Sequence, residues 1–173
     1  MTEPARNQNR FRVAQLNPRH ATAFELAPDA AARAAIATEL DLSALPALRF
    51  GGEIRPAPHD AWEVAARLSA KVVQPCVVTL APVKTSISEE VHRIFSPHVT
   101  TPEGDEVEMG DDELEPLGQV IDIEAMMIEA LSLALPLYPR AEGAALDAPE
   151  DEPAEETRKP FAGLADLMKK TEN

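Results

Sequence analysis

The side chains best suited to chemistry in this chain are one cysteine, Cys76, and four histidines. His92 and His98 follow Cys76 in the sequence, and the three could supply metal ligands or a Cys–His nucleophile pair. Their spacing matches no structural zinc pattern, and no local signature of a nucleophile surrounds the cysteine. Cys76 is better interpreted as a small buried residue.

The acidic run between residues 103 and 115 is the other candidate for binding a cation. It lacks the regular Asp-x-Asp-x-Asp-Gly spacing that wraps oxygen ligands around calcium. The chain also contains no phosphate loop, no Gly-x-Gly dinucleotide fingerprint and no Gly-x-Ser-x-Gly elbow. The sequence therefore gives no positive indication of an enzyme, a cofactor or a metal.

Acidic residues dominate the composition, with 30 Asp and Glu against 16 Lys and Arg and a formal net charge of −14. Nonspecific binding to nucleic acid depends on lysines and arginines that release counterions, so this balance opposes it. A basic protein is the easier electrostatic partner, because opposite surface potentials accelerate encounter. The plainer alternative is that the acidic residues only maintain solubility.

Several features predict a cytoplasmic protein. A single cysteine excludes an intrachain disulfide framework. The opening stretch MTEPARNQNRFRV lacks the apolar core of a secretory signal. The most apolar segment, residues 121–140, is interrupted by three acidic side chains and so does not predict a membrane span.

The first half of the chain predicts mostly strands. Short strands are expected over residues 12–16 and 21–27, followed by an alanine-rich helix within 28–42. A strand over 47–56 could carry a bulge at Gly51-Gly52. Apolar and polar residues then alternate from Trp62 to Val73, which predicts a long strand with one buried face, although local propensity also permits a helix there.

The next segment predicts two more strands. Residues 76–83 place Cys76, Val78 and Leu80 on one face and end at Pro82, and residues 83–95 alternate again. Two adjacent β segments predict an antiparallel hairpin. A polar, acidic surface loop is expected at about residues 100–119, because it cannot bury enough apolar area to become ordered.

A helix is predicted over residues 123–135. Asp122 is suited to cap its first turn, and Pro136 cannot continue it. The apolar side chains at helical spacing are expected to pack on the sheet; they are Ile123, Met127, Ala130, Leu131 and Ala134. The sequence thus predicts an α+β domain over residues 1–140, with an antiparallel sheet and a covering helix. The sheet could be open or could close into a barrel.

Two further segments complete the predicted organisation. Residues 141–157 are acidic and without periodicity, which predicts a disordered linker. Residues 158–173 predict a short amphipathic helix whose apolar face carries Phe161, Leu164, Leu167 and Met168. So short a helix is marginal alone in water, so it would dock either on its own domain or on a partner.

Three segments of the chain, taken in order, resemble the YceD family of large ribosomal RNA subunit accumulation proteins. They are QPCVVTLAPVKTSISEEVHRIFSP, IDIEAMMIEALSLALPLYPR and KPFAGLADL, and the resemblance extends from about Leu48 to the C-terminus. Many family members have Cys-x-x-Cys where this chain has Val73 and Cys76, and a further cysteine where it has PRAEGA. A closed zinc site would lack two sulfur ligands, so no zinc is expected.

The resemblance implies a role in accumulation of large-subunit ribosomal RNA, and hence in assembly of the large ribosomal subunit, without implying a catalytic site. The first hypothesis is a non-enzymatic factor that holds a basic partner, such as a ribosomal protein or an assembly intermediate. Acidic residues would shield this partner, and the apolar face of the 158–173 helix would grip it. The acidic residues concerned include Asp111, Asp112, Glu113, Glu150, Asp151 and Glu152.

The alternative is direct binding of ribosomal RNA by the folded domain. The basic side chains available for this are Arg6, Arg10, Arg12 and Arg19, helped by Lys71, Lys84 and Arg93. Exposed aromatic side chains on a sheet would strengthen the hypothesis. Trp62 and Phe95, the candidates in the β segments, are both expected to face inward. An enzyme that processes or modifies the RNA ranks third, because no converging set of histidines and carboxylates is visible.

Overall fold

The computed structural model describes residues 9–99 and 114–145 of the chain. All the elements below lie in the first of two compact units, Met1–Gly143. Asp111, Asp112 and Glu113 of the acidic loop lie outside the described residues, as do most of the predicted linker and the whole of the predicted terminal helix. Those predictions therefore remain untested.

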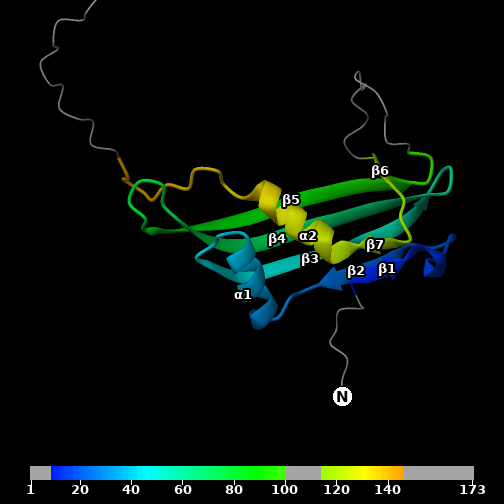
Figure 1. Cartoon of the computed structure of the whole chain (residues 1–173), viewed down its shortest axis with the longest axis horizontal. Coiled ribbons are helices and arrows are strands. Elements are labelled where there is room, and N and C mark those ends of the chain that lie inside the picture. Colours follow the sequence, from blue (N-terminus) through cyan, green and yellow to red (C-terminus); the bar gives the residue numbers. More distant parts are fainter. Residues whose placement is uncertain (1–8, 100–113, 146–173) are drawn as a thin grey trace, which may run out of the picture. The chain divides into compact units, whose positions relative to one another are not determined.

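A five-stranded sheet forms the body of the first unit (Figure 1). Its strands run in the order β2-β3-β4-β5-β6, and their bounds are Thr22–Leu26, Ala44–Ala57, Ala61–Pro75, Pro82–Ser96 and Leu114–Pro116. Neighbouring strands are antiparallel, except that β6 runs parallel to the end of β5. Strands β2 and β6 lie at the two edges and do not pair with each other, so the sheet is open. The expectation that the sheet could close into a barrel is therefore wrong.

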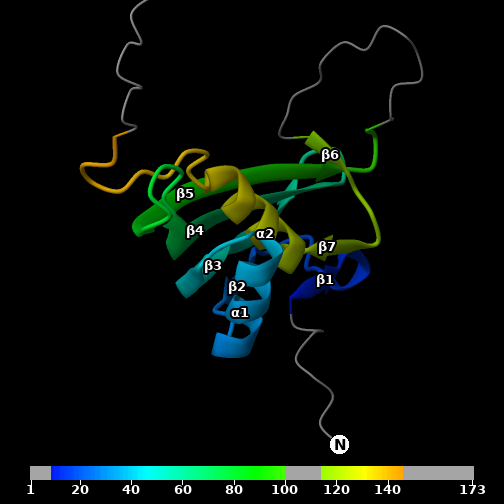
Figure 2. The ribbon, with the colours of Figure 1, turned by 60° about the vertical axis from the view of Figure 1, so that its left-hand side comes forward.

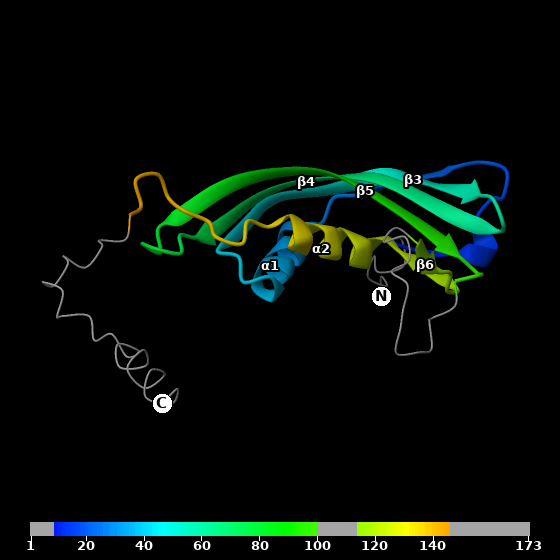
Figure 3. The same cartoon turned by 90° about the horizontal axis from the view of Figure 1, so that it is seen from above.

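Two short strands form a separate antiparallel pair, β1 (Arg10–Arg12) with β7 (Val120–Asp122). A single 3-10 turn, η1 (Val13–Gln15), follows β1. Both α-helices, α1 (Ala30–Glu39) and α2 (Ile123–Ala134), lie on the same face of the curved sheet (Figures 2 and 3). The structure is thus a mixed α+β fold, as predicted. None of the described helices is long and apolar enough to span a membrane.

The core lies between this face of the sheet and α2. Alternate residues of β4 are buried, including Val64 and Leu68, and they face buried residues of β3 such as Ile54 and Phe50 across the ladder. The helix contributes fully buried side chains from one stripe, namely Ile123, Met127 and Leu131. The long strand predicted from the alternation after Trp62 is confirmed, and the competing helix is wrong.

The first turn of α2 joins three parts of the chain. The Asp122 carboxylate accepts a hydrogen bond from the Ala125 N–H at 3.0 Å, which satisfies a donor that the helix itself cannot use. The Arg10 guanidinium lies 3.0 Å from the other oxygen of the same carboxylate, and the Ile123 N–H donates to the Asn9 carbonyl at 3.0 Å. Asp122 therefore links the β1–β7 pair to the helix.

Three local predictions are corrected by the structure. Residues 13–15 form a 3-10 turn in place of the strand predicted over 12–16, and this turn leads Leu16 into the core. Residues 76–81 form the turn between β4 and β5, because Pro75 and Pro82 lie opposite each other as its last paired residues. Gly51 and Gly52 keep regular register with β4, and the irregularity lies between Ala44 and Ala47.

Gly52 is required by a close approach of two backbones. A Cβ at this position would lie 2.1 Å from the Ala65 carbonyl oxygen and 2.6 Å from the Ala66 Cα, so the strands would have to separate. A Cβ at Gly51 would meet its nearest heavy atom, the Phe24 carbonyl oxygen, at an ordinary 3.6 Å. Adjacent glycines on one strand thus differ sharply in what they tolerate.

We predict that Gly52→Ala lowers the free energy of unfolding by about 3 kcal/mol, the upper end of overpacking costs. Gly51→Ala is the matched control and is expected to change it by less than about 0.5 kcal/mol, as for an ordinary surface substitution. Urea unfolding followed by circular dichroism measures both. Equal effects of the two substitutions would show that the close approach at Gly52 is absent in solution.

Candidate docking surface at the hairpin tip

Two segments far apart in the sequence meet at one end of the sheet. The first is the β4–β5 turn, residues 76–81, and the second is the stretch that follows α2, residues 135–141 (Figure 1). The Val77 N–H donates to the Pro139 carbonyl at 2.9 Å, and the Gln74 side-chain amide donates to the Pro136 carbonyl at 3.3 Å. We call these two joined segments the tip.

The turn has its own internal bonds. The Cys76 N–H donates to the Ala81 carbonyl at 2.8 Å, and the Leu80 N–H donates to the Cys76 carbonyl at 3.0 Å. Leu80 is held at a φ of +58°, in the left-handed region that glycine and asparagine occupy at little cost. A leucine there costs roughly 1 kcal/mol or more. The turn therefore has a strained leucine at a position where glycine or asparagine would be relaxed.

The Cys76 thiol is the centre of the tip. Its Sγ accepts hydrogen bonds from three backbone N–H groups, those of Val78 and Thr79 at 3.4 Å and that of Ala141 at 3.3 Å. The Thr79 side chain, followed by the backbone N–H groups, lowers the pKa of Cys76 from 9.0 to about 6. The side chain is fully buried, and this burial raises the pKa against the larger effect of the hydrogen bonds. Through the bond from Ala141, the Cys76 sulfur thus helps to hold the second segment of the tip against the first.

Apolar side chains stand out from the tip into solvent. Six large hydrophobic side chains are exposed among residues 9–99 and 114–145, and four of them belong to these two segments. We call these four the tip patch: Val77, 49% exposed; Leu80, 77%; Leu137, 86%; and Tyr138, 77%. Exposed apolar side chains on two joined segments are typical of interaction surfaces in soluble proteins. Because the backbone beneath is fixed by hydrogen bonds, the patch is preorganised for binding.

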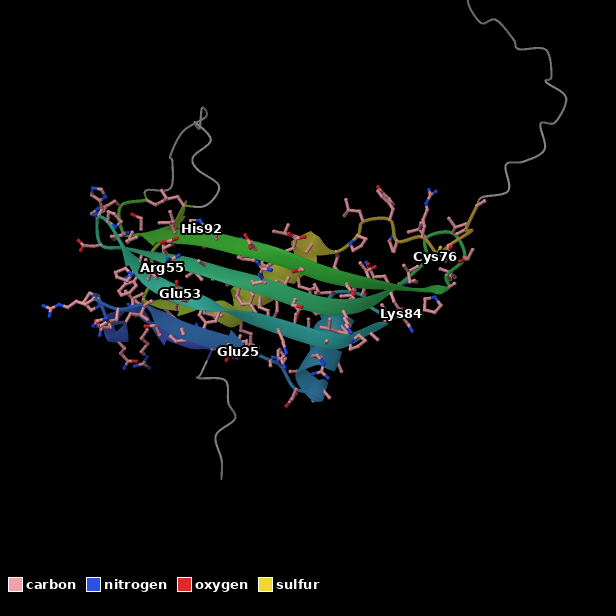
Figure 4. The ribbon with its side chains drawn as sticks, turned by 180° about the vertical axis from the view of Figure 1, so that it is seen from behind. Glu25, Glu53, Arg55, Cys76, Lys84 and His92 are labelled. Atoms are coloured by element: carbon pink, nitrogen blue, oxygen red, sulfur yellow. The ribbon has the colours of Figure 1, made fainter. Side chains whose placement is uncertain are left out.

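Basic side chains lie beside the tip patch. Lys71 and Lys84 belong to the strands that lead into and out of the turn, and Arg140 follows the tip patch residues Leu137 and Tyr138. None of the three forms an ion pair with another described residue. Figure 4 shows Lys84 close to Cys76 at this end of the sheet. Within the described part of the chain, the tip thus combines apolar contact area with basic side chains that form no ion pair.

The rest of the exposed sheet face is polar and internally paired (Figure 4). Its arginines each meet a glutamate on the same or a neighbouring strand: Arg49 with Glu25, Arg55 with Glu53 and Glu63, and Arg67 with Glu90. A shallow depression of about 560 Å³ lies in this face, above the small residues Ala23, Gly51 and Ala65. Its charged walls are already neutralised, which makes it a weak site for phosphate groups.

The structure separates the side chains considered for metal or nucleophilic chemistry. Cys76 lies in the turn that precedes β5, whereas His92 lies near the other end of that strand, 2.8 Å from a Glu63 carboxylate oxygen. No group of three potential metal ligands occurs among residues 9–99 and 114–145. The described part of the chain therefore brings together no nucleophile and base at the tip.

The structure also locates the basic residues considered for RNA binding. Arg93 pairs with Glu115 and Glu129, and Arg10 pairs with Asp122, so both charges are neutralised locally. Trp62 and Phe95 are buried, as predicted. Of the basic residues named for that hypothesis, Lys84 lies near the start of β5, opposite Val73, and Lys71 lies further from the turn, opposite Ser86.

The sequence-predicted sites and the tip hardly overlap. Asp122, Ile123, Met127 and Leu131 lie at the start and buried face of α2, and Pro136 lies just beyond its end. The acidic cluster Asp111–Glu113 and the terminal apolar residues Phe161, Leu164, Leu167 and Met168 are outside the described residues. The tip patch was missed, because Val77 and Leu80 were assigned to a strand. The flanking prolines at 75 and 82 were the available signal for a turn.

We predict that the Cys76 thiol titrates with a pKa of about 6, measured as thiolate absorbance at 240 nm, with Cys76→Ser as the blank. Since the folded-state pKa is lowered, the thiolate's contribution to stability is complete above pH 9 and is lost as the pH falls through about 6. The excess of the wild-type melting temperature over that of Cys76→Ser should therefore shrink from pH 9 to pH 6. A thiol that titrates near its ordinary pKa would contradict the hydrogen-bonded thiolate.

A protein-family model described as large ribosomal RNA subunit accumulation protein YceD matches residues 64–168. The match begins in β4 and includes both segments of the tip. Comparison with curated proteins and with solved structures gave no match.

Proposed function

The chain belongs to the YceD family of large ribosomal RNA subunit accumulation proteins, and on this premise we propose that it holds a basic protein during assembly of the large ribosomal subunit. It does so without catalysis, as a factor that keeps a ribosomal protein bound until it is delivered. The tip patch supplies the apolar contact, and acidic segments of the chain attract the basic partner.

The single observation that carries this proposal is the exposed leucine at the strained position of the turn. Gly or Asn at residue 80 would relieve the left-handed strain and would remove an apolar side chain from water. Residues that break a local rule without a structural gain are typical of functional sites. A side chain that is costly to the free protein is explained if a partner covers it.

The distribution of charge supports a basic partner. The described residues carry 11 Lys and Arg against 14 Asp and Glu, a net charge of only −3, whereas the whole chain carries −14. The acidic residues are therefore concentrated in residues 100–113 and 146–173. Asp147 follows Ala141 of the tip by only six residues along the chain, so an acidic run and the tip are neighbours in the sequence. A basic chain is attracted to such a run.

The geometry of the described residues gives no support to catalysis. The tip presents aliphatic groups and one phenol, and the Cys76 side chain is fully buried. An active site would need a nucleophile or base able to reach a substrate, with a second group to orient it. A binding role is consistent with a surface that has apolar area and charge but no accessible reactive group.

Direct contact with ribosomal RNA is the second candidate, and one observation favours it. Tyr138 is exposed beside Arg140, and Lys71 and Lys84 lie without ion pairs to described residues on the strands of the tip. An aromatic ring with flanking cations is a common platform for unpaired bases. It ranks second because three of the four side chains of the tip patch are aliphatic and cannot stack on bases.

Affinity purification of the tagged full chain at low salt, with and without ribonuclease, tests the proposal. We predict that a small basic ribosomal protein is retained after ribonuclease treatment. Leu80→Asn should reduce this retention by about tenfold, as for a residue central to an interface. The same variant should unfold at an equal or higher temperature than the wild type, because asparagine tolerates the left-handed region.

The matched control is Leu114→Asn, the same change at an exposed leucine outside the tip. Leu114 lies on β6 and is 43% exposed. It should bind as the wild type does. Retention of large-subunit components only while RNA is intact would favour the RNA hypothesis. Equal retention by Leu80→Asn and Leu114→Asn would remove the tip from the mechanism.

A further inference from the structure

Among residues 9–99 and 114–145, one side of β5 pairs with no other strand along most of its length. The strand pairs with β4 from Pro82 to Phe95 on one side, whereas on the other side β6 covers only Ile94–Ser96. Among residues 9–99 and 114–145, no strand pairs with this side of residues 82–93. An edge of this length presents a row of backbone donors and acceptors to any strand that can lie beside it.

We propose that this edge binds the same edge of a second copy, antiparallel and centred on Ile87, to form a twofold symmetric dimer. Residues directly opposite in an antiparallel pair share one face of the sheet, so only residues of the same parity along β5 can face each other. With Ile87 opposite Ile87 of the second copy, Lys84 lies opposite Glu90, and by symmetry Glu90 lies opposite Lys84. Val83 then faces Val91, and Ser86 faces Ser88.

The charges along β5 favour this register over its neighbours. Lys84 has no ion pair with a described residue, and Glu90 already pairs with Arg67 across β4. In the dimer each Glu90 lies between Arg67 of its own chain and Lys84 of the other, and opposite charges across strands stabilise pairing. Moving the centre to Ser88 sets Ile87 against Glu89 and leaves Lys84 against His92. Centring on Glu89 sets two carboxylates face to face.

Charged residues on an edge strand ordinarily prevent pairing. On β5 the charged residues are arranged so that two copies complement each other in one register, with Lys84 opposite Glu90. The neighbouring registers instead place Ile87 opposite Glu89 or Glu89 opposite Glu89. The pattern therefore selects one partner strand, its own copy, and disfavours unrelated strands. This inference goes beyond the holding role and does not depend on it.

The dimer would have a direct consequence for binding. Because the two β5 strands run in opposite directions, each tip lies beside the region around His92 of the other copy, and the two tips point to opposite ends. A dimer thus presents two tip patches, far enough apart to engage separate sites. Such bivalent binding raises the overall affinity without any new contact.

Light scattering coupled to gel filtration of the full chain tests the proposal. The wild type should elute at twice the chain mass of 18.7 kDa. Lys84→Glu and Glu90→Lys should each raise the dimer dissociation constant by about tenfold or more, because each replaces two attractive contacts by two repulsive ones. An equimolar mixture of the two variants should restore the dimer, since opposite charges then face each other at both positions.

Lys71→Glu is the matched control, because Lys71 lies on β4 on the same face but away from the open edge. It makes the same charge change and should leave the dimer intact. Far-UV circular dichroism of each variant establishes that it is folded. A monomeric wild type at its highest soluble concentration, dimeric charge-reversed variants, or a mixture that stays monomeric would each overturn the proposal.

Discussion

The packing of α2 against the sheet holds the other parts of the structure in place. Three side chains of the helix, Ile123, Met127 and Leu131, are fully buried there, and each contributes about 1.5–3 kcal/mol through removal of apolar surface from water. At its first turn the helix anchors the β1–β7 pair through Asp122. Beyond its last turn the chain reaches the β4–β5 hairpin through the bonds at Pro136 and Pro139. The tip forms because α2 positions the following residues, 135–141, against the β4–β5 turn.

Charge and apolar surface are divided between different parts of the chain. The described residues are nearly balanced in charge, and most arginines of the sheet face are paired with glutamates. The described residues carry only −3 of the net charge of −14, so most of the net negative charge belongs to the other segments of the chain. The tip patch, in contrast, belongs to the well-packed body of the protein. A basic protein with an apolar contact surface can use both features, which suits a factor of a family concerned with ribosomal RNA accumulation.

Several parts of this structure could be predicted from the sequence because one face of a long element is buried. The alternation of apolar and polar residues after Trp62 reflects the buried face of β4, and the helical spacing of apolar residues from Ile123 to Leu131 reflects the buried face of α2. Closure of the sheet could not be predicted, because it depends on whether β2 and β6 meet. The turn at residues 76–81 was mistaken for a strand because Val77 and Val78 favour strands locally. The tip patch was missed for a related reason. Exposure of Leu80 or Leu137 is a property of two segments that meet only in the folded protein.

If a protein component of the large subunit lies on the tip patch, photo-crosslinking in growing cells will capture it there. A photoreactive amino acid is placed at residue 137 in one strain and, for comparison, at residue 114 in another. We expect a crosslink from residue 137 to a small basic ribosomal protein and none from residue 114. A crosslink from residue 137 to RNA alone, or equal crosslinking from both positions, would contradict it.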